Sequence, residues 1–221
     1  MSKLSPATTE ELYVRTASDP VVHGNHVVLR PIVPSDYLRL FAIATDPRVS
    51  YRWRFRGASP SFEEFVGSLT DRTLVHYVVV SKHNEEIVGL VTAYASSQRD
   101  RYCYLGVLGS PEYRGSGAVF QGVVLFIDYL FKVWDLRKIY MESLEFNFAS
   151  FRSGVGRYFE IEGVLVSHEY YDGQYWNLYV LATTRELWAS KRERLLKLVG
   201  VGKGPLKAEP QTSGSSALNS P

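Results

Sequence analysis

The sequence predicts one mixed α+β domain, in which helices flank a mostly antiparallel central sheet of about seven strands. Segments rich in β-branched and aromatic residues alternate with amphipathic helical segments along the 221 residues. Two pairs of the strand-like segments are joined by short polar turns, which is typical of antiparallel hairpins. The composition, 45% hydrophobic and 22% charged, is that of a folded domain with a sizeable core.

The first half of the chain is expected to contain a strand, two helices and a hairpin. Val27 and Leu29 mark a strand that ends at a proline-rich turn, where Ser35 is placed to cap a helix. A second helix begins at Ser61, because Glu64 stands three residues later in the capping-box position. The helix that Ser35 caps and the two hairpin strands are expected over 35–44, 74–80 and 87–94.

The second half of the chain centres on a long apolar helix over 118–134. Its polar residues Gln121, Asp128, Lys132 and Asp135 fall on one narrow stripe, so the helix must lie against the sheet. A later hairpin turns at Asp172-Gly173, a typical tight-turn pair. The remaining elements are strands at 102–108, 139–146, 164–171 and 175–181 and helices at 149–159 and 185–198.

Composition changes near both ends of the chain. Residues 1–20 are expected to be a flexible segment and residues 200–221, rich in Gly, Pro and Ser, a disordered tail, which leaves one domain over 21–199. The start lacks the apolar stretch of a secretory signal, and polar residues interrupt the long helix. We therefore expect a cytoplasmic protein with no membrane partner.

Charge and cysteine content exclude several classes of protein. The formal net charge is only +2, which gives no electrostatic case for a dedicated nucleic-acid partner. The single cysteine, Cys103, excludes a disulfide framework and a multi-cysteine metal site. The histidines are scattered, so no metal is expected.

The strongest chemical signal is the glycine turn between the fourth predicted strand and the long helix. Residues 114–118, R-G-S-G-A, can curl so that several backbone N–H groups point into one concavity at a helix N-terminus, which suits phosphate. An ordinary glycine turn is the alternative. Ala118-Val119 stands where a nucleoside-triphosphate loop needs Lys-Ser or Lys-Thr, and Phe120 stands where a dinucleotide fingerprint needs its third glycine.

Five short motifs stand in order along the chain. They are Leu29-Arg30-Pro31, Pro111-Glu112-Tyr113-Arg114-Gly115, Asn147-x-x-Ser150, Phe159-x-x-Glu162-Gly163 and Tyr171-x-Gly173-x-Tyr175. With the order of the elements, they resemble the GNAT superfamily of acetyl-CoA-dependent N-acetyltransferases, and within it the branch of the ribosomal-protein N-terminal acetyltransferases. The glycine turn matches that family's phosphate signature, Gln/Arg-x-x-Gly-x-Gly/Ala, except at Val119.

The resemblance implies a sheet that splays between its fourth and fifth strands and admits coenzyme A there. Backbone amides of the glycine turn would hold the pyrophosphate, and the pantetheine arm would pair along the fourth strand. The residues implied to bind acetyl-CoA are Leu105, Val107, Leu108, Arg114, Gly115, Ser116, Gly117, Ala118, Val119 and Asn147.

The resemblance also implies direct attack of a neutral amine on the thioester, with a backbone N–H of residues 105–108 as donor to the oxyanion. Ser150 would protonate the leaving thiolate, directly or through a water, and Asn147 would orient the arm or a water. The alternative role for Ser150 is that of a helix cap. Glu169 matches the general base of the ribosomal-protein branch. The competing carboxylates are Glu142, Glu145 and Glu162.

The acceptor is expected to be a primary amine of a protein or peptide N-terminus or of a small molecule. With a pKa of about 8, an α-amine is roughly a tenth neutral at pH 7, against less than about a thousandth for lysine. In an extended conformation, the arginines of residues 51–56 would form a rim for an anionic or carboxylate-bearing acceptor, and a surface arginine row is the alternative. The residues expected to bind the acceptor are Arg52, Trp53, Arg54, Tyr171 and Tyr175.

Two functions stay open from sequence. The first is the N-acetyltransferase. The second is a non-catalytic acyl-CoA-binding or partner-binding module that keeps the fold, motivated by Val119 and by Gly154, which stands where many family members carry a tyrosine. The resemblance alone suggests a homodimer.

Overall fold

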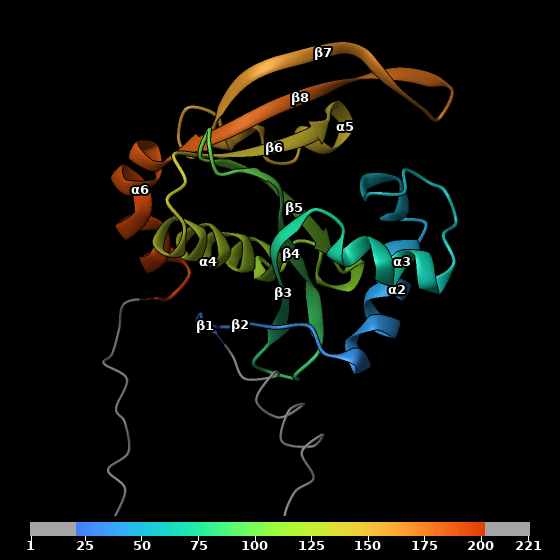
Figure 1. Ribbon diagram of the computed structural model, residues 1–221, viewed down its shortest axis with the longest axis horizontal. Helices are drawn as coiled ribbons and strands as arrows, with labels where there is room; N and C mark the ends of the chain where they lie inside the picture. The colour runs from blue at the N-terminus through green and yellow to red at the C-terminus, as the bar shows by residue number, and fades with distance from the viewer. Residues whose placement is uncertain (1–20, 202–221) are drawn as a thin grey trace, which may run out of the picture.

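The computed structural model describes residues 21–201, and its centre is an eight-stranded sheet (Figure 1). The strands are β1 (Val22–His23), β2 (Val27–Arg30), β3 (Thr73–Ser81), β4 (Ile87–Ser97), β5 (Tyr102–Gly109), β6 (Lys138–Leu144), β7 (Glu160–Tyr171) and β8 (Gln174–Thr184). Their order across the sheet is β1-β2-β3-β4-β5-β6-β8-β7, and β5 with β6 is the one parallel pair among them. The predicted fold class is confirmed, and the short β1 is an addition to the predicted strands.

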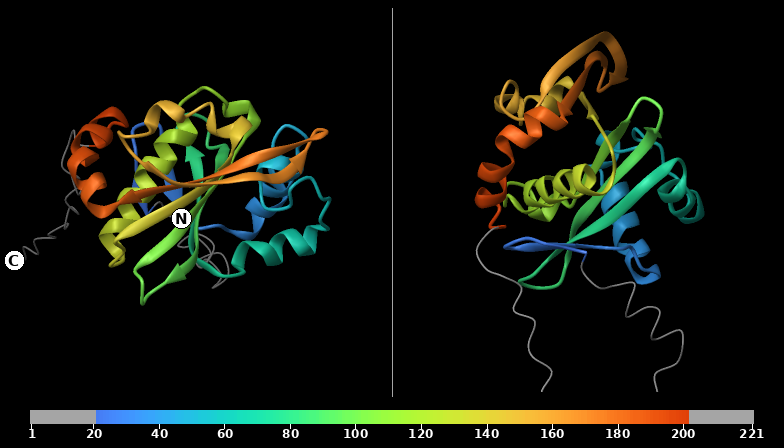
Figure 2. Two further views of the ribbon diagram at one scale, coloured as in Figure 1. Left: turned by 90° about the horizontal axis from the view of Figure 1, so that it is seen from above. Right: turned by 60° about the vertical axis from the view of Figure 1, so that its left-hand side comes forward.

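Helices cover both faces of the sheet (Figures 1 and 2). They are α2 (Tyr37–Thr45), α3 (Phe62–Thr70), α4 (Ala118–Val133), α5 (Glu145–Phe148) and α6 (Arg185–Leu198). On one face α2 and α3 cover a core that includes Phe65 and Leu108. On the other face α4 and α6 cover a larger core that includes Phe126 and Trp188. The central strands are therefore buried from both sides, and the ends of β5 stay fixed between two cores.

The polar stripe of α4 contacts α6. Gln121 donates a hydrogen bond to the carbonyl of Val199 at 2.9 Å. The buried carboxylate of Asp128 pairs with Arg192 Nε at 2.5 Å and with Lys132 Nζ at 2.7 Å. These buried polar groups have hydrogen-bond partners, as buried polar groups normally do. Their directional contacts fix how the two helices pack, so α6 holds α4 against the sheet.

The sheet opens between β5 and β6. Among the described residues, these strands pair at three positions, which are Tyr102 with Lys138, Cys103 with Ile139 and Tyr104 with Tyr140. Beyond Tyr104, β5 stays paired with β4 to Gly109, while β6 stays paired with β8 to Leu144. The splay predicted between the fourth and fifth predicted strands is confirmed. It leaves one edge of β5 without a strand partner in the described chain.

Ser35 does not cap the first helix, so that prediction was wrong: α2 begins after Asp36, whose side chain makes no cap hydrogen bond to the helix and is held by the preceding residues instead. The Asp36 carboxylate is buried, accepts the N–H of Val33 at 2.9 Å and accepts two hydrogen bonds from Arg30, at 2.6 and 2.8 Å. A serine hydroxyl cannot satisfy both partners. Residues 34–36 accordingly form a 3-10 turn before α2 begins.

Two other local signals are confirmed. The hydroxyl of Ser61 accepts the N–H of Glu64 at 3.1 Å, and the Glu64 carboxylate accepts the N–H of Ser61 at 2.7 Å, which completes the capping box. At the tip of the β7–β8 hairpin, Asp172 and Gly173 have φ of 52° and 79°. Positive φ at both positions is what a two-residue turn of this kind requires.

The chain after β6 differs from the prediction. The strand expected to reach residue 146 ends at Leu144, and α5 begins directly after it. The helix expected over 149–159 does not form, and these residues make turns with one 3-10 turn at Arg152–Gly154. Phe148 explains the early turn, because its buried ring stacks on Tyr179 with centroids 4.3 Å apart. Gly156 has φ of 71°, which is outside the helical region.

The last described residues close α6. Gly200, with φ of 77°, donates its N–H to the Lys197 carbonyl at 3.2 Å, and Val201 donates to the Leu196 carbonyl at 2.8 Å. The sequence assigned these two residues to the tail. The expected flexible segment, 1–20, and the rest of the expected tail, 202–221, lie outside the described residues. Across 21–201, no helix has the length and apolar character needed to span a membrane.

Candidate active site

A cavity of about 480 Å³ lies where β5 and β6 separate. Its walls come from the two diverging strands, from the connection between α2 and α3, and from the start of α5. The strands contribute residues 105–107 of β5 and 141–144 of β6 to the lining. The connection contributes residues 52, 53, 54 and 56, and α5 contributes residues 146 and 147. The cavity therefore collects residues that are far apart in the sequence and that the splay brings together.

Gly106 and Glu142 lie on opposite arms of the splay. Tyr104 and Tyr140 form the last β5–β6 pair, and these two residues stand two positions further along each strand, on the same face of the sheet. A Cβ built on Gly106 would lie 3.7 Å from the Trp53 ring and 2.8 Å from a Thr92 methyl group. Glycine at this position lets the β5 backbone border the cavity directly.

Two buried polar groups beside Gly106 lack partners. Over residues 21–201, the Trp53 Nε1–H and the Thr92 hydroxyl are both buried with no hydrogen-bond partner. Thr92 pairs with Gly106 in the β4–β5 register, and Trp53 lines the cavity. Buried polar groups are normally satisfied, so this part of the floor has hydrogen-bonding capacity that the fold itself does not use.

β5 leads from the cavity to the glycine turn. Gly115 and Gly117 have φ of 81° and 78°, and Gly117 is the N-cap of α4. The first N–H groups of the helix have no acceptors within it and add to the positive end of the helix dipole. A Cβ on Gly109 would lie 3.2 Å from Val119 Cγ2, so Val119 packs on the end of β5. The turn is open to an anion.

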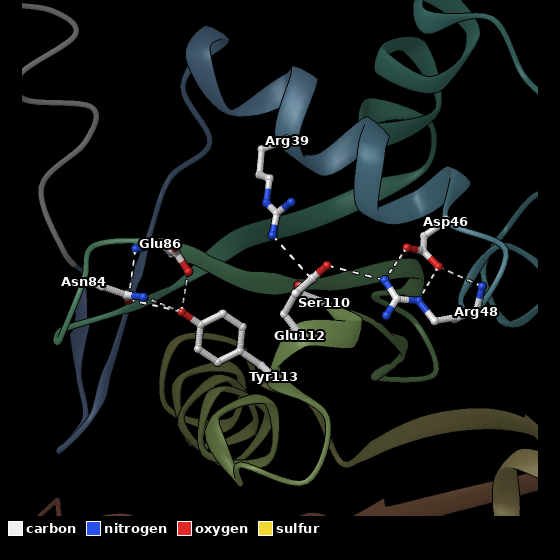
Figure 3. A network of polar contacts seen from close by, with 8 residues as sticks. All are labelled: Arg39, Asp46, Arg48, Asn84, Glu86, Ser110, Glu112 and Tyr113. Atoms are coloured by element: carbon white, nitrogen blue, oxygen red, sulfur yellow. Dashed lines mark hydrogen bonds and ion pairs between the residues drawn. The ribbon is translucent and has the colours of Figure 1, made fainter.

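A polar network holds the turn that precedes these glycines, as Figure 3 shows. Glu112 contacts the Ser110 hydroxyl, Arg39 Nη2 at 3.4 Å and Arg48 Nη2 at 3.5 Å. The hydrogen bond from Ser110 lowers the pKa of Glu112. Tyr113 donates to Glu86 at 2.8 Å. Each exposed ion pair contributes at most about 1 kcal/mol to stability. Together the contacts connect the glycine turn to α2 and to the segment that follows α2 and borders the cavity.

The predicted arginine row borders the cavity without being extended, so that conformation was wrong. Residues 50–52 form a 3-10 turn and residues 54–57 turn again. Arg52, Arg54 and Arg56 nevertheless all line the cavity. The Arg54 guanidinium lies 5.4 Å from the Trp53 ring centroid and 5.6 Å from that of Tyr94. Burial lowers the pKa of Arg54.

The β7–β8 hairpin contacts the outer side of this wall. Tyr171 stacks on Tyr51 with centroids 3.7 Å apart, and Glu169 pairs with Arg56 at 3.3 Å. Tyr175 is 65% exposed and packs against Tyr170 instead. Neither Tyr171 nor Tyr175 lines the cavity itself, so the hairpin braces the arginine segment from behind.

Of the four carboxylates considered as a general base, Glu142 alone lines the cavity. Glu169 is held by Arg56, and Glu162 pairs with Lys138. Glu145 begins α5 outside the lining. The structure therefore separates candidates that the sequence could not rank.

Asn147 borders the cavity and Ser150 does not. Asn147 Nδ2 donates to the Ser143 hydroxyl at 3.5 Å, and Ser143 is buried and lines the cavity. Ser150 is exposed, and its hydroxyl donates to the Asn147 carbonyl at 2.7 Å. This is a local contact from side chain to backbone. Ser150 caps no helix start, because the 3-10 turn that follows, Arg152–Gly154, has Phe151 at its N-cap position.

The predicted strand residues divide between the two faces of β5. Leu105 and Val107 line the cavity, whereas Leu108 is 1% exposed in the core beneath α2. Cys103 is fully buried on the same strand, and burial raises the pKa of its thiol to about 12. A thiol with that pKa supplies almost no thiolate at neutral pH, so Cys103 cannot carry an acyl group as a nucleophile.

Three further residues line the cavity without a signal in any sequence motif: Asp71, Arg72 and Tyr94. Asp71 and Arg72 follow α3, and Tyr94 stands near the end of β4. The β3–β4 register brings the two segments together, with the Ala95 N–H donating to the Arg72 carbonyl at 3.0 Å. Within the part of the chain that the structure describes, no cluster of His, Cys, Asp and Glu is suited to hold a metal ion.

A mixed sheet that splays beside a glycine turn at the start of its central helix is the arrangement expected of the acetyltransferase family that the sequence resembles. The family model described as the acetyltransferase (GNAT) domain matches residues 26–153, more than half of the chain. The chain belongs to the GNAT acetyltransferase family. The predicted family and enzyme class, an acetyl-CoA-dependent N-acetyltransferase, are confirmed.

Solved structures share this fold at low sequence identity. The spermidine N-acetyltransferase from Vibrio cholerae in complex with CoA and spermine has a TM-score of 0.66 and 20% identity, covering 74% of this chain and 98% of its own. A GNAT-family acetyltransferase from Bacillus anthracis has a TM-score of 0.62 and 15% identity, covering 75% of this chain and 98% of its own. A GCN5-related N-acetyltransferase from Brucella melitensis has a TM-score of 0.65 and 19% identity, covering 81% of this chain and 85% of its own. No curated protein matches the chain.

Proposed function

We propose that this chain transfers the acetyl group of acetyl-CoA to a primary amine by direct attack, with both substrates bound together. The observation that carries the proposal is the cavity at the splay, where an unpaired edge of β5 faces a carboxylate across a space of about 480 Å³. Buried Cys103 supports direct attack, because the cavity offers no thiol to accept the acetyl group first.

Residues on and after β5 fit coenzyme A. The backbone of the glycine turn suits its diphosphate, and the unpaired edge of β5 suits its extended, amide-bearing arm. Leu108 contributes through its backbone, since its side chain is in the core. When bound, acetyl-CoA supplies an activated thioester. The residues proposed to hold it are Leu105, Val107, Leu108, Arg114, Gly115, Ser116, Gly117, Ala118, Val119 and Asn147.

Glu142 is the proposed general base. The amine nitrogen forms the new bond to the acetyl carbon as the C–S bond breaks. Starting from a neutral amine, one proton leaves nitrogen toward Glu142 and one is taken up by sulfur. A β5 backbone N–H beside Gly106 stabilises the negative charge that develops on the carbonyl oxygen. Glu169 stays the competing base, and its ion pair with Arg56 favours a bracing role.

Ser150 and Asn147 are the proposed residues on the leaving-group side. Asn147 borders the cavity and Ser150 contacts the Asn147 backbone, so Ser150 acts through a water held by this pair. Ser150 has little proton transfer to perform, because the thiolate of a thiol with a pKa of about 8.5 leaves readily and is protonated by solvent at neutral pH.

An α-amine is the proposed acceptor group, as in the ribosomal-protein branch that the sequence resembles. Support comes from Glu142, the carboxylate that the splayed strands place in the cavity. At pH 7 roughly a tenth of an α-amine is already neutral, against less than about a thousandth of a lysine amine, so an α-amine asks much less of this base. Arg52, Trp53 and Arg54 line the acceptor side directly, and Tyr171 with Tyr175 belong to the hairpin behind it.

The proposal is tested by unfolding and by thiol release. Acetyl-CoA at about a hundred times its dissociation constant should add roughly 2.7 kcal/mol, a shift of several degrees in Tm, with NAD and ATP as controls. A panel of α-amino peptides should then release free thiol from acetyl-CoA. A Tm shift without thiol release from any amine would favour the non-catalytic acyl-CoA-binding module, and no shift at all would contradict both.

A further inference from the structure

The charged side chains of the cavity are mainly cationic. Four arginines line it, against two carboxylates. Their sequence positions are Arg52, Arg54, Arg56 and Arg72, and the carboxylates are Asp71 and Glu142. Because Glu142 is assigned to the acceptor amine, the remaining lining carries a clear excess of positive charge.

These arginines differ in how far the protein itself neutralises them. Arg56 is paired with Glu169 at 3.3 Å. Arg54 is half-buried between aromatic rings and donates to the Ser68 carbonyl, and burial lowers its pKa. Arg52 and Arg72 are exposed, and neither forms an ion pair with another described residue. Arg52 and Arg72 are therefore charged side chains at the cavity that no carboxylate of the described residues holds, so they are available to pair with an anionic group of a ligand.

A second cavity lies next to the first. Arg72 and Ala95 line both, and the second, of about 630 Å³, is otherwise bordered by residues that include Tyr102 and Tyr104. Tyr104 stacks on Tyr140 with centroids 5.3 Å apart, which makes an aromatic floor on the sheet face. Burial and the nearby Glu142 raise the pKa of Tyr104, so its hydroxyl stays protonated and can donate to an oxygen.

The two cavities adjoin each other at Arg72 and Ala95. The first cavity contains Arg52, whose guanidinium lies 5.8 Å from the Phe146 ring centroid, and Arg72 stands where the cavities join. A small amine would fill one cavity alone. An extended chain that starts at Glu142 would occupy both and pass Arg72.

On the basis of the acetyltransferase function proposed above, we propose that the acceptor is the N-terminal segment of a polypeptide with carboxylate side chains among its first residues. Its α-amine lies at Glu142, its carboxylates meet Arg52, Arg54 and Arg72, and its following residues pass over Tyr102 and Tyr104. This differs from the polyamine named with the solved Vibrio cholerae enzyme, because a polycation would meet uncompensated arginines here.

The test uses hexapeptides that share an N-terminal serine and carry three Glu, three Gln or three Lys at the next positions. We expect kcat/KM, measured by thiol release, to be about tenfold higher for the Glu peptide than for the Gln peptide and lowest for the Lys peptide, because a charge-assisted hydrogen bond is about twice as strong as a neutral one. The preference should shrink as salt is raised, since the exposed charges are then screened.

Arginine variants locate the recognition. Arg52→Gln and Arg72→Gln should each raise KM for the Glu peptide about fivefold, with a smaller change for the Gln peptide. Arg194→Gln is the matched control, because Arg194 is an exposed arginine on α6 far from the lining in sequence and in the fold. Equal effects in all three variants would overturn the assignment.

A comparison of further acceptors and a binding measurement complete the test. A Lys peptide or spermidine that is acetylated as well as the Glu peptide would overturn the charge argument, and a single glutamate α-amide that matches the Glu hexapeptide would overturn the role of the second cavity. Equilibrium binding of a C-terminally labelled Glu peptide in the presence of CoA is measured separately. Binding of that peptide with no thiol release from any acceptor would contradict the proposed function and support the recognition surface.

Discussion

The cofactor side and the acceptor side of the cavity are built in different ways. The glycine turn is one continuous segment, residues 114–119, fixed by two positive φ values and by the helix that follows. The acceptor side is assembled from segments around Arg52, Arg72, Tyr94 and Glu142, which meet only in the folded sheet. A local motif can be recognised from sequence, whereas a composite wall has to be found in the structure.

This contrast also predicts how the two sides respond to mutation. A change in the glycine turn alters backbone geometry and should affect acetyl-CoA alone. A change in the composite wall removes one of several side chains and should affect the acceptor or the chemical step. The following predictions use that difference, beginning with the largest expected effect.

Glu142→Gln should lower kcat by about 100-fold, since general-base catalysis contributes at least that factor. The amide keeps the size of the side chain but cannot take a proton. The loss should be larger with a lysine-like amine than with an α-amine, because the lysine-like amine is more fully protonated at pH 7. The measurement is kcat by thiol release, with both classes of amine, from pH 6.5 to about 9.

Glu169→Gln is the control for that experiment. Glu169 braces the arginine segment through Arg56, so its loss should raise KM for the acceptor severalfold and leave the pH profile unchanged. A larger fall in kcat for Glu169→Gln than for Glu142→Gln would reverse the assignment of the base.

Asp128→Asn should destabilise the fold by about 2 kcal/mol at pH 7, because it leaves Arg192 and Lys132 facing a neutral group at a buried position. Burial raises the pKa of Asp128, but hydrogen bonds from Arg192 and Lys132 outweigh it and the net pKa is lowered. Because the pKa is lower in the folded state, the charged carboxylate stabilises the folded protein at pH values above the unfolded-state pKa of about 3.9. This stabilisation is lost as the pH falls through the folded-state pKa.

Urea unfolding at pH 7 and at pH 3 measures this effect. The free-energy difference between Asp128→Asn and the parent should be smaller at pH 3. Glu193→Gln is the matched control, because Glu193 is an exposed partner of Lys197 on the same helix and its loss should leave the unfolding midpoint unchanged. A constant difference at both pH values would show that packing, and not charge, holds α6 on α4.

Gly117→Ala should weaken acetyl-CoA binding about tenfold and leave acceptor KM unchanged. With φ of 78° at the start of α4, alanine costs about 1–2 kcal/mol in the left-handed region, and relaxation of the turn moves the N–H groups. Gly67→Ala is the control, since Gly67 lies in α3 with open space around it and should stabilise the helix by about 0.5–1 kcal/mol. Isothermal calorimetry with acetyl-CoA measures the first effect, and an equal change in acceptor KM would contradict the separation of the two sides.

The extent of sequence prediction follows the same division. The strands, the long helix, the Ser61 cap and the glycine turn depend on neighbouring residues and were predicted. The end of β6 was misplaced because it depends on Phe148 stacking on Tyr179, thirty-one positions away. Arg72 and Tyr94 were missed for the same reason, since their place in the cavity is set by the β3–β4 register.

Ser150→Ala is expected to have the smallest effect, a fall in kcat of about threefold or less, because a thiolate leaving group with a pKa near 8.5 needs little acid at neutral pH. Ser150 contacts the Asn147 backbone and does not line the cavity. Asn147→Ala should therefore cost more, since its side chain borders the cavity and donates to Ser143. Any effect of Ser150→Ala should grow above about pH 8.5, where solvent no longer protonates the thiolate readily. A fall of 100-fold at pH 7 would instead make Ser150 the essential acid, and the leaving-group side would then depend on one local motif, as the glycine turn does.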